Sequence, residues 1–146
     1  MPTWYGLDYP SIRDLEDHAS MFDIGTHYLD IPQPAVVWDK HGPAGIIIPN
    51  YSGVLARSWA IAHELGHLVL GHGYIRNHMR TSQETDANRW AAGALIPEAR
   101  VQHYRTRTVA GFLRAIGKHY QPVPPEGGIR PLACAIAYRR LEIMEG

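Results

Sequence analysis

The segment WAIAHELGHLVLGHG, residues 59–73, carries His63 and His67 four positions apart, with Glu64 directly after the first histidine. Residues four apart on an α-helix lie about 40° apart around its axis, so the two imidazoles can reach one metal ion. Glu64 lies about 100° round from His63, where its carboxylate can reach a water on that ion without binding the ion. Zinc lowers the pKa of such a water, and the carboxylate takes the proton as the water attacks a carbonyl carbon. The spacing therefore predicts the chemistry of a zinc metallopeptidase.

A catalytic zinc site also needs a third protein ligand. A five-residue motif by itself carries a real risk of chance occurrence, so a suitable third ligand elsewhere in the chain would strengthen the interpretation. The segment SQETDANRWAAGALIP, residues 82–97, offers Glu84 and Asp86. Helical periodicity places Glu84 and Asn88 on one face, while Asp86 points elsewhere. We therefore predict Glu84 as the third ligand. Asn88 is predicted to accept the free ring N–H of a zinc-bound histidine and so to fix the tautomer of that ring.

The composition is that of a soluble globular chain. Apolar residues make up 45% of the 146 residues and charged residues 19%, which is too hydrophobic for a disordered chain and enough to bury a core. We predict a single metallopeptidase domain over residues 1–146. The 14 Lys and Arg residues balance the 14 Asp and Glu residues, which argues against direct binding to nucleic acid. The single cysteine favours a reducing compartment. The N-terminus does not resemble a leader, and no apolar run reaches the length of a membrane span. We therefore expect a cytoplasmic protein without a membrane partner.

The order of apolar patterns predicts an α+β fold, in which an N-terminal helix and a small antiparallel sheet precede the zinc-binding helix and C-terminal helices. Ser11 is a candidate N-cap for the first helix, and Gly71 is placed to end the zinc-binding helix. Strands are expected in THYLDI and in AVVWDKHGPAGIIIP, the second of which looks like a hairpin with Gly42 and Pro43 in its loop. Helices are expected over residues 11–22, 54–70, 82–95, 108–119 and 131–144.

Two motifs in the same order resemble the ImmA/IrrE family of zinc metallopeptidases: ARSWAIAHELGHLVLGH, residues 56–72, and ETDANRWAAGALIP, residues 84–97. The family pattern has Phe where Trp59 and Trp90 stand, and Met is usual in place of Ile96. None of these departures touches the proposed chemistry. Carried over by position, the resemblance implies zinc ligands at His63, His67 and Glu84 and a general base at Glu64.

The resemblance also implies a function: a zinc-dependent endopeptidase that cleaves a cytosolic protein. Relatives act on DNA-bound repressors of the helix-turn-helix class, so such a repressor is the first substrate that the resemblance suggests. A non-proteolytic, zinc-containing module or regulator that binds a partner protein is the alternative. A DNA-binding regulator is disfavoured by the zero net charge and by the lack of an obvious recognition helix. Some family members carry a DNA-binding or sensory domain, and we expect neither within these 146 residues.

Other residues stay open as candidates. His72 lies beyond Gly71, off the ligand face of a continuing helix, which fits a surface histidine or a support for a ligand better than a ligand. An extended substrate is expected beside the strand GIIIP, residues 45–49, if that strand forms an edge. Cys134 lies in an apolar helical pattern typical of a buried small side chain. The candidates for stabilising the oxyanion of a tetrahedral intermediate, among which the pattern does not choose, are Tyr74, His78, His103 and Tyr104.

Overall fold

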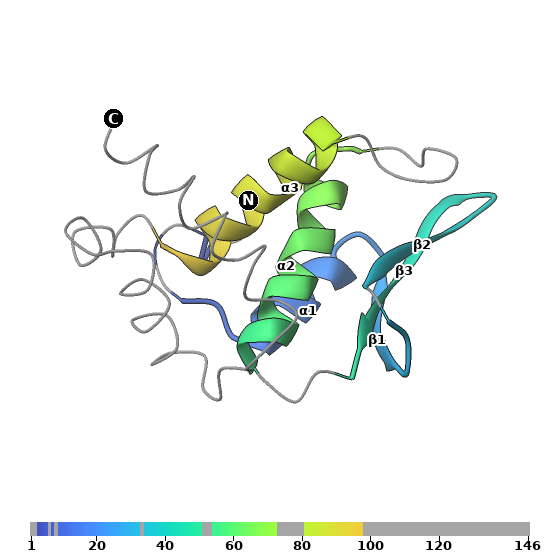
Figure 1. Cartoon of the computed structure of the whole chain (residues 1–146), viewed down its shortest axis with the longest axis horizontal. Coiled ribbons are helices and arrows are strands. Elements are labelled where there is room, and N and C mark those ends of the chain that lie inside the picture. The colour runs from blue at the N-terminus through green and yellow to red at the C-terminus, as the bar shows by residue number, and fades with distance from the viewer. Residues whose placement is uncertain are drawn as a thin grey trace.

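The computed structural model describes residues 3–5, 7, 9–32, 34–50, 54–72 and 81–97. Its three helices and three strands follow the order α1 (Ile12–Ser20), β1 (Gly25–Leu29), β2 (Ala35–Asp39), β3 (Gly42–Pro49), α2 (Val54–Val69) and α3 (Thr81–Leu95). The sheet lies on one side of α2, and α3 packs along the other side (Figure 1). The predicted α+β class is therefore confirmed. The helices expected over residues 108–119 and 131–144 lie outside the described residues. Within the described ranges, no helix is long and apolar enough to cross a membrane.

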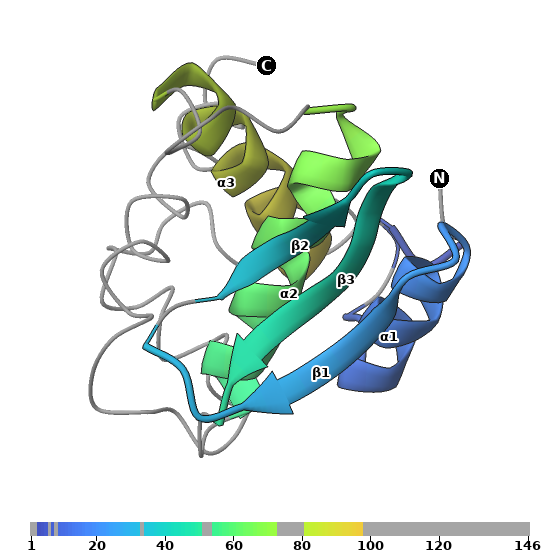
Figure 2. The same ribbon diagram turned by 90° about the vertical axis from the view of Figure 1, so that its right-hand side faces the viewer.

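The sequence predicted an antiparallel sheet, but the observed sheet is mixed. Strands β2 and β3 form the predicted hairpin, although its turn lies at residues 40–41 and Gly42 and Pro43 already belong to β3. Strand β1 does not pair with β2; it pairs in parallel with β3, with Gly25 opposite Gly45. The resulting order is β1-β3-β2 (Figure 2). In this central position, Ile46 and Ile48 of β3 are fully buried.

This order corrects the expected position of a substrate. Residues 45–49 pair with β1 on one side, and β2 pairs with residues 42–47 on the other side. Residues 45–47 are thus paired on both sides, so an extended peptide has no free edge to join along them. Among the described strands, the edges belong to β1 and β2.

Helix α1 begins with the predicted cap. The backbone N–H of Asp14 donates to Ser11 Oγ at 3.0 Å, and the backbone N–H of Ser11 donates to Asp14 Oδ2 at 2.8 Å. This reciprocal pair satisfies two donors that the first helical turn leaves without partners. Leu15 and Ala19 are fully buried, whereas Phe22, inside the expected helix over residues 11–22, follows the end of α1 and is 41% exposed.

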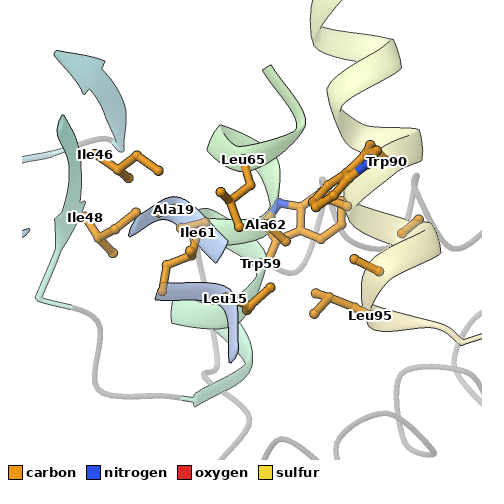
Figure 3. Packing of buried hydrophobic residues seen from close by; sticks show 14 of the residues in the cluster. Leu15, Ala19, Ile46, Ile48, Trp59, Ile61, Ala62, Leu65, Trp90 and Leu95 are labelled. Carbon is orange, nitrogen blue, oxygen red and sulfur yellow. The ribbon is translucent and has the colours of Figure 1, made fainter. Parts of the chain in front are cut away.

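The core forms where α1, β3, α2 and α3 meet (Figure 3). Isoleucines from the inner face of β3 point towards α2, and Trp59 and Trp90 fill the space between the helices. The largest fully buried side chains are Leu15, Ile24, Ile46, Ile48, Ile61, Leu65, Leu95 and Ile96. This packing anchors α2 on both sides, so the side chains that α2 presents to α3 are held on a fixed support.

Helices α2 and α3 approach closely at Gly66. A Cβ atom at this position would lie 2.9 Å from the carbonyl oxygen of Ala87 and 3.1 Å from its Cα. Any larger residue would therefore meet backbone and not a side chain that can turn away. Gly66 is next to His67, and Ala87 is one position before Asn88, so the close approach brings the two predicted motifs together.

Candidate metal centre

The structure brings His63, His67 and Glu84 together from two helices. His63 Nε2 lies 3.0 Å from Glu84 Oε2, and His67 Nε2 lies 3.1 Å from Glu84 Oε1. The two Nε2 atoms are 3.2 Å apart. Within the part of the chain that the structure describes, these three residues form a group whose ligand atoms all lie within 4.8 Å of one another.

These distances fit the coordination shell of one small cation. Tetrahedral zinc has ligands at roughly 2.0 to 2.2 Å, which places neighbouring ligand atoms about 3.4 Å apart. Each histidine offers its Nε2 and Glu84 offers its carboxylate, the set of two nitrogens and one oxygen that catalytic zinc uses in several peptidases. The side chain of His67 is 3% exposed, whereas that of Glu84 is 44% exposed. The cluster is thus closed on the α2 side and reachable from solvent on the α3 side.

Glu84 occupies the first turn of α3, where the partial positive charge of the helix end favours a carboxylate. Hydrogen bonds from His63 and His67 hold the pKa of Glu84 well below its usual range, against the opposing effect of burial. Burial lowers the pKa of His63, but the hydrogen bond to Glu84 and the charges of Glu64 and Glu84 outweigh it, so that this pKa is raised. The cluster therefore holds its carboxylate in the charged form that binds a metal.

Asn88 lies where the sequence predicted it. Its Oδ1 is 2.7 Å from Nδ1 of His63, the ring nitrogen that does not face Glu84. An amide oxygen can only accept a hydrogen bond, so this contact selects the tautomer of His63 that carries its proton on Nδ1. The Nε2 lone pair is then free to bind a metal ion.

Glu64 lies on α2 between the two histidines and is 6% exposed. Burial raises the pKa of Glu64, while the charges of His63 and His67 act in the opposite direction. A buried carboxylate with a raised pKa has the property that a general base needs near neutral pH. The cluster of ligand atoms does not include Glu64, as expected for a base that reaches water and not the ion.

His72 contacts His67 without joining the ligand cluster, which agrees with one of its two expected roles, a support for a ligand. Its Nδ1 lies 2.9 Å from Nδ1 of His67. The expectation that His72 leaves the ligand face assumed a continuing helix, but Gly71 has φ 71° and turns the chain back. The glycine itself is the signal that could have revealed this contact, since a left-handed residue after a helix folds the next residue onto the last turn.

The remaining sequence candidates are placed as follows. Asp86 is exposed and lies outside the ligand cluster, as its helical position suggested. Trp59 and Trp90 are buried core residues. The oxyanion candidates and the cysteine lie outside the described residues, namely Tyr74, His78, His103, Tyr104 and Cys134.

Comparison with known proteins agrees with this geometry. None of the curated proteins and none of the solved structures matches the chain closely enough to count as a relative. The sequence model of the IrrE N-terminal-like domain, Peptidase_M78, matches residues 19–110. That match spans more than half of the 146 residues and contains the whole ligand cluster, so the chain belongs to this peptidase family.

Proposed function

We propose that this protein is a zinc-dependent endopeptidase of the cytoplasm. The observation that carries the proposal is the convergence of two histidine nitrogens and one carboxylate beside a buried glutamate, with the cluster open to solvent on one side. A purely structural zinc site is usually closed by four protein ligands and has no use for a neighbouring carboxylate that is not a ligand.

When bound, zinc supplies a Lewis acid that lowers the pKa of water and polarises the carbonyl of the scissile peptide bond. The protein's own residues do the rest. His63, His67 and Glu84 hold the ion, and Asn88 orients His63. Glu64 takes a proton from the attacking water and can deliver it to the amine that leaves, because its raised pKa suits both transfers.

The proposed substrate is a protein, and a DNA-binding repressor of the helix-turn-helix class is the first to test. Support for a protein substrate comes from the peptidase family and from the exposed side of the cluster beside α3. A peptide in extended form would need an edge strand, and β1 and β2 are the described strands that have one.

The decisive variant is Glu64→Gln, which keeps the shape of the side chain and removes the base. We expect zinc content to stay near one ion per chain while cleavage of a co-expressed candidate repressor falls by about 10²-fold or more. Zinc is measured by elemental analysis, and cleavage is followed by immunoblot of the repressor. If wild type and Glu64→Gln both hold zinc and silence the repressor equally without cutting it, the protein is a binding module and not a peptidase.

A further inference from the structure

The end of α2 is built so that His72 folds back onto His67. Gly71, with φ 71°, adopts the left-handed conformation that closes many helices. The N–H of Gly71 donates to the carbonyl of Leu68 at 3.1 Å, and the N–H of His72 donates to the carbonyl of His67 at 2.9 Å. These two bonds define a Schellman motif, whose geometry brings the third residue after the helix against the third residue from its end. In this chain both of those residues are histidines.

The side chains of this pair also meet. The Nδ1 atoms are 2.9 Å apart, and the ring centroids are 5.1 Å apart. His67 thus has a separate partner for each ring nitrogen, because its Nε2 faces Glu84 at 3.1 Å. With its side chain 3% exposed, His67 has little access to water that could replace a lost partner.

We propose that His72 is a positioning residue of the metal centre: its unprotonated Nδ1 accepts the Nδ1–H of His67 and so holds the Nε2 of His67 towards the ion. The inference rests on the proposed function, in which the cluster binds zinc. It gives His67 the same kind of support that Asn88 gives to His63. The two supports come from different elements, Asn88 from α3 and His72 from the chain after α2.

His72 does not act as a fourth ligand in this arrangement. The two nitrogens of an imidazole point in different directions, so a group bonded to Nδ1 of His67 lies away from an ion bonded to Nε2. The ligand cluster accordingly contains His63, His67 and Glu84 without His72. A neutral imidazole has one donor and one acceptor nitrogen, and the acceptor is what His67 requires here.

The test compares zinc dissociation constants, measured by competition with a chromophoric chelator, for wild type, His72→Ala and His72→Asn. We expect His72→Ala to weaken zinc binding roughly 10- to 100-fold, the usual effect of removing the partner of a histidine ligand. Asparagine places its Oδ1 near the position of a histidine Nδ1, so His72→Asn should stay within about threefold of wild type. His41→Ala, in the exposed turn before β3, is the matched control and should not change the affinity.

A spectroscopic readout separates positioning from general damage. In zinc-loaded wild type, NMR should detect the Nδ1–H proton of His67 as protected from solvent exchange, and His72→Ala should remove that protection. His72→Asn should restore it. The unfolding temperature of the metal-free protein should be close to that of wild type in His72→Asn, because this variant keeps an acceptor for the buried ring of His67.

A second pair of variants tests the same contact through the backbone. Gly71 and Gly42 both have positive φ, and a Cβ at either position would meet no atom within 4 Å. Alanine is strained at both positions for the same conformational reason. We expect Gly71→Ala to weaken zinc binding at least about tenfold through the displaced His72, and Gly42→Ala to leave it unchanged.

The outcomes separate this inference from the proposed function. Zinc affinity that is unchanged in His72→Ala, or lowered equally in His72→Ala and His72→Asn, would overturn the positioning role while leaving the metal centre in place. A wild-type protein that binds no zinc would overturn the proposed function and this inference together. If His72→Ala fails to fold, the comparison of Gly71→Ala with Gly42→Ala decides, and equal zinc affinities in that pair would count against the role.

Discussion

Each histidine of the cluster uses both of its ring nitrogens. His63 faces Glu84 with Nε2 and Asn88 with Nδ1, while His67 faces Glu84 with Nε2 and His72 with Nδ1. A histidine on an apolar helix face is often just a buried polar group with one satisfied partner. Here the second partner on each ring orients the first nitrogen, which is the arrangement that metal ligands need.

Asn88 gives a prediction at the scale of one hydrogen bond. Asn88→Ala removes the acceptor 2.7 Å from His63 Nδ1 and should weaken zinc binding roughly 10- to 100-fold. Asn88→Asp keeps an acceptor oxygen in the same place and should bind zinc at least as tightly as wild type. Chelator competition on the three proteins checks this. Equal affinity in wild type and Asn88→Ala would reduce Asn88 to a packing residue.

The choice of third ligand can be tested against its neighbour. Glu84 touches both histidines, whereas Asp86 is exposed and outside the cluster. Glu84→Ala should therefore lose stoichiometric zinc, and Asp86→Ala should keep it, as measured by elemental analysis after gel filtration. Retention of zinc by Glu84→Ala together with its loss in Asp86→Ala would make Asp86 the third ligand instead.

At the scale of elements, the site depends on how closely α2 and α3 approach. His63, His67 and Glu64 come from α2, and Glu84 and Asn88 come from α3. Neither helix carries a complete ligand set, so the distance between their axes decides whether the set closes. Gly66 controls that distance, because a side chain there would meet the backbone of Ala87.

Gly66→Ala is the corresponding test. A Cβ 2.9 Å from the carbonyl oxygen of Ala87 must push the helices apart, which should lower the free energy of unfolding by roughly 1 to 3 kcal/mol and weaken zinc binding. Gly93→Ala is the control on α3, at a glycine that faces Tyr5 and not α2. Its Cβ would meet the hydroxyl end of Tyr5, a side chain that can shift, so its zinc affinity should remain that of wild type. Urea unfolding and chelator competition give the two quantities. The prediction fails if Gly66→Ala binds zinc as wild type does.

At the scale of the whole molecule, stability should depend on pH in opposite directions with and without metal. The pKa of His63 is raised above its usual 6.5, so the metal-free folded state holds this proton more tightly than the unfolded chain. This stabilisation is fully present below about pH 6.5, the pKa of the unfolded chain, and is lost as pH rises through the raised pKa of the folded state. The raised pKa of Glu64 also makes the metal-free fold less stable as pH rises, and this loss begins at lower pH because the usual pKa of glutamate is 4.5. Metal-free protein should therefore lose stability as pH rises above about 6.5.

Bound metal reverses the slope. Zinc needs His63 without a proton on Nε2, so zinc affinity should rise with pH through the same range, and ligand binding to the folded state adds stability. Thermal unfolding of zinc-loaded and chelator-treated protein between about pH 6.5 and 8.5 checks both slopes. The Glu84→Ala variant should show the same slope with and without zinc, and this slope should be shallower than that of metal-free wild type, because the variant lacks the carboxylate that raises the pKa of His63. Parallel slopes for the loaded and stripped wild type would contradict the proposed linkage between metal and His63.

Much of the local structure was predictable because it depends on nearby residues. Short-range spacing accounts for the capping box of Ser11 and Asp14 and for the turn at Gly71 after α2. It also accounts for the bounds of α2 and α3. The same spacing placed both histidines on one face of α2 and put Glu84 and Asn88 on one face of α3. The two motifs together also indicated the family that the chain belongs to.

The tertiary structure alone decided what depends on partners distant in the chain. β-propensity marks a strand but does not say which strand lies beside it, so the insertion of β3 between β1 and β2 was not predictable from the pattern. The contact of Gly66 with Ala87 likewise depends on two helices that are separated along the chain. The contact of His72 with His67 has a local cause, because Gly71 turns the chain back at the end of α2. That the two side chains face each other was seen only in the structure. Local periodicity thus selects the residues on each face, and packing between distant elements decides which faces meet.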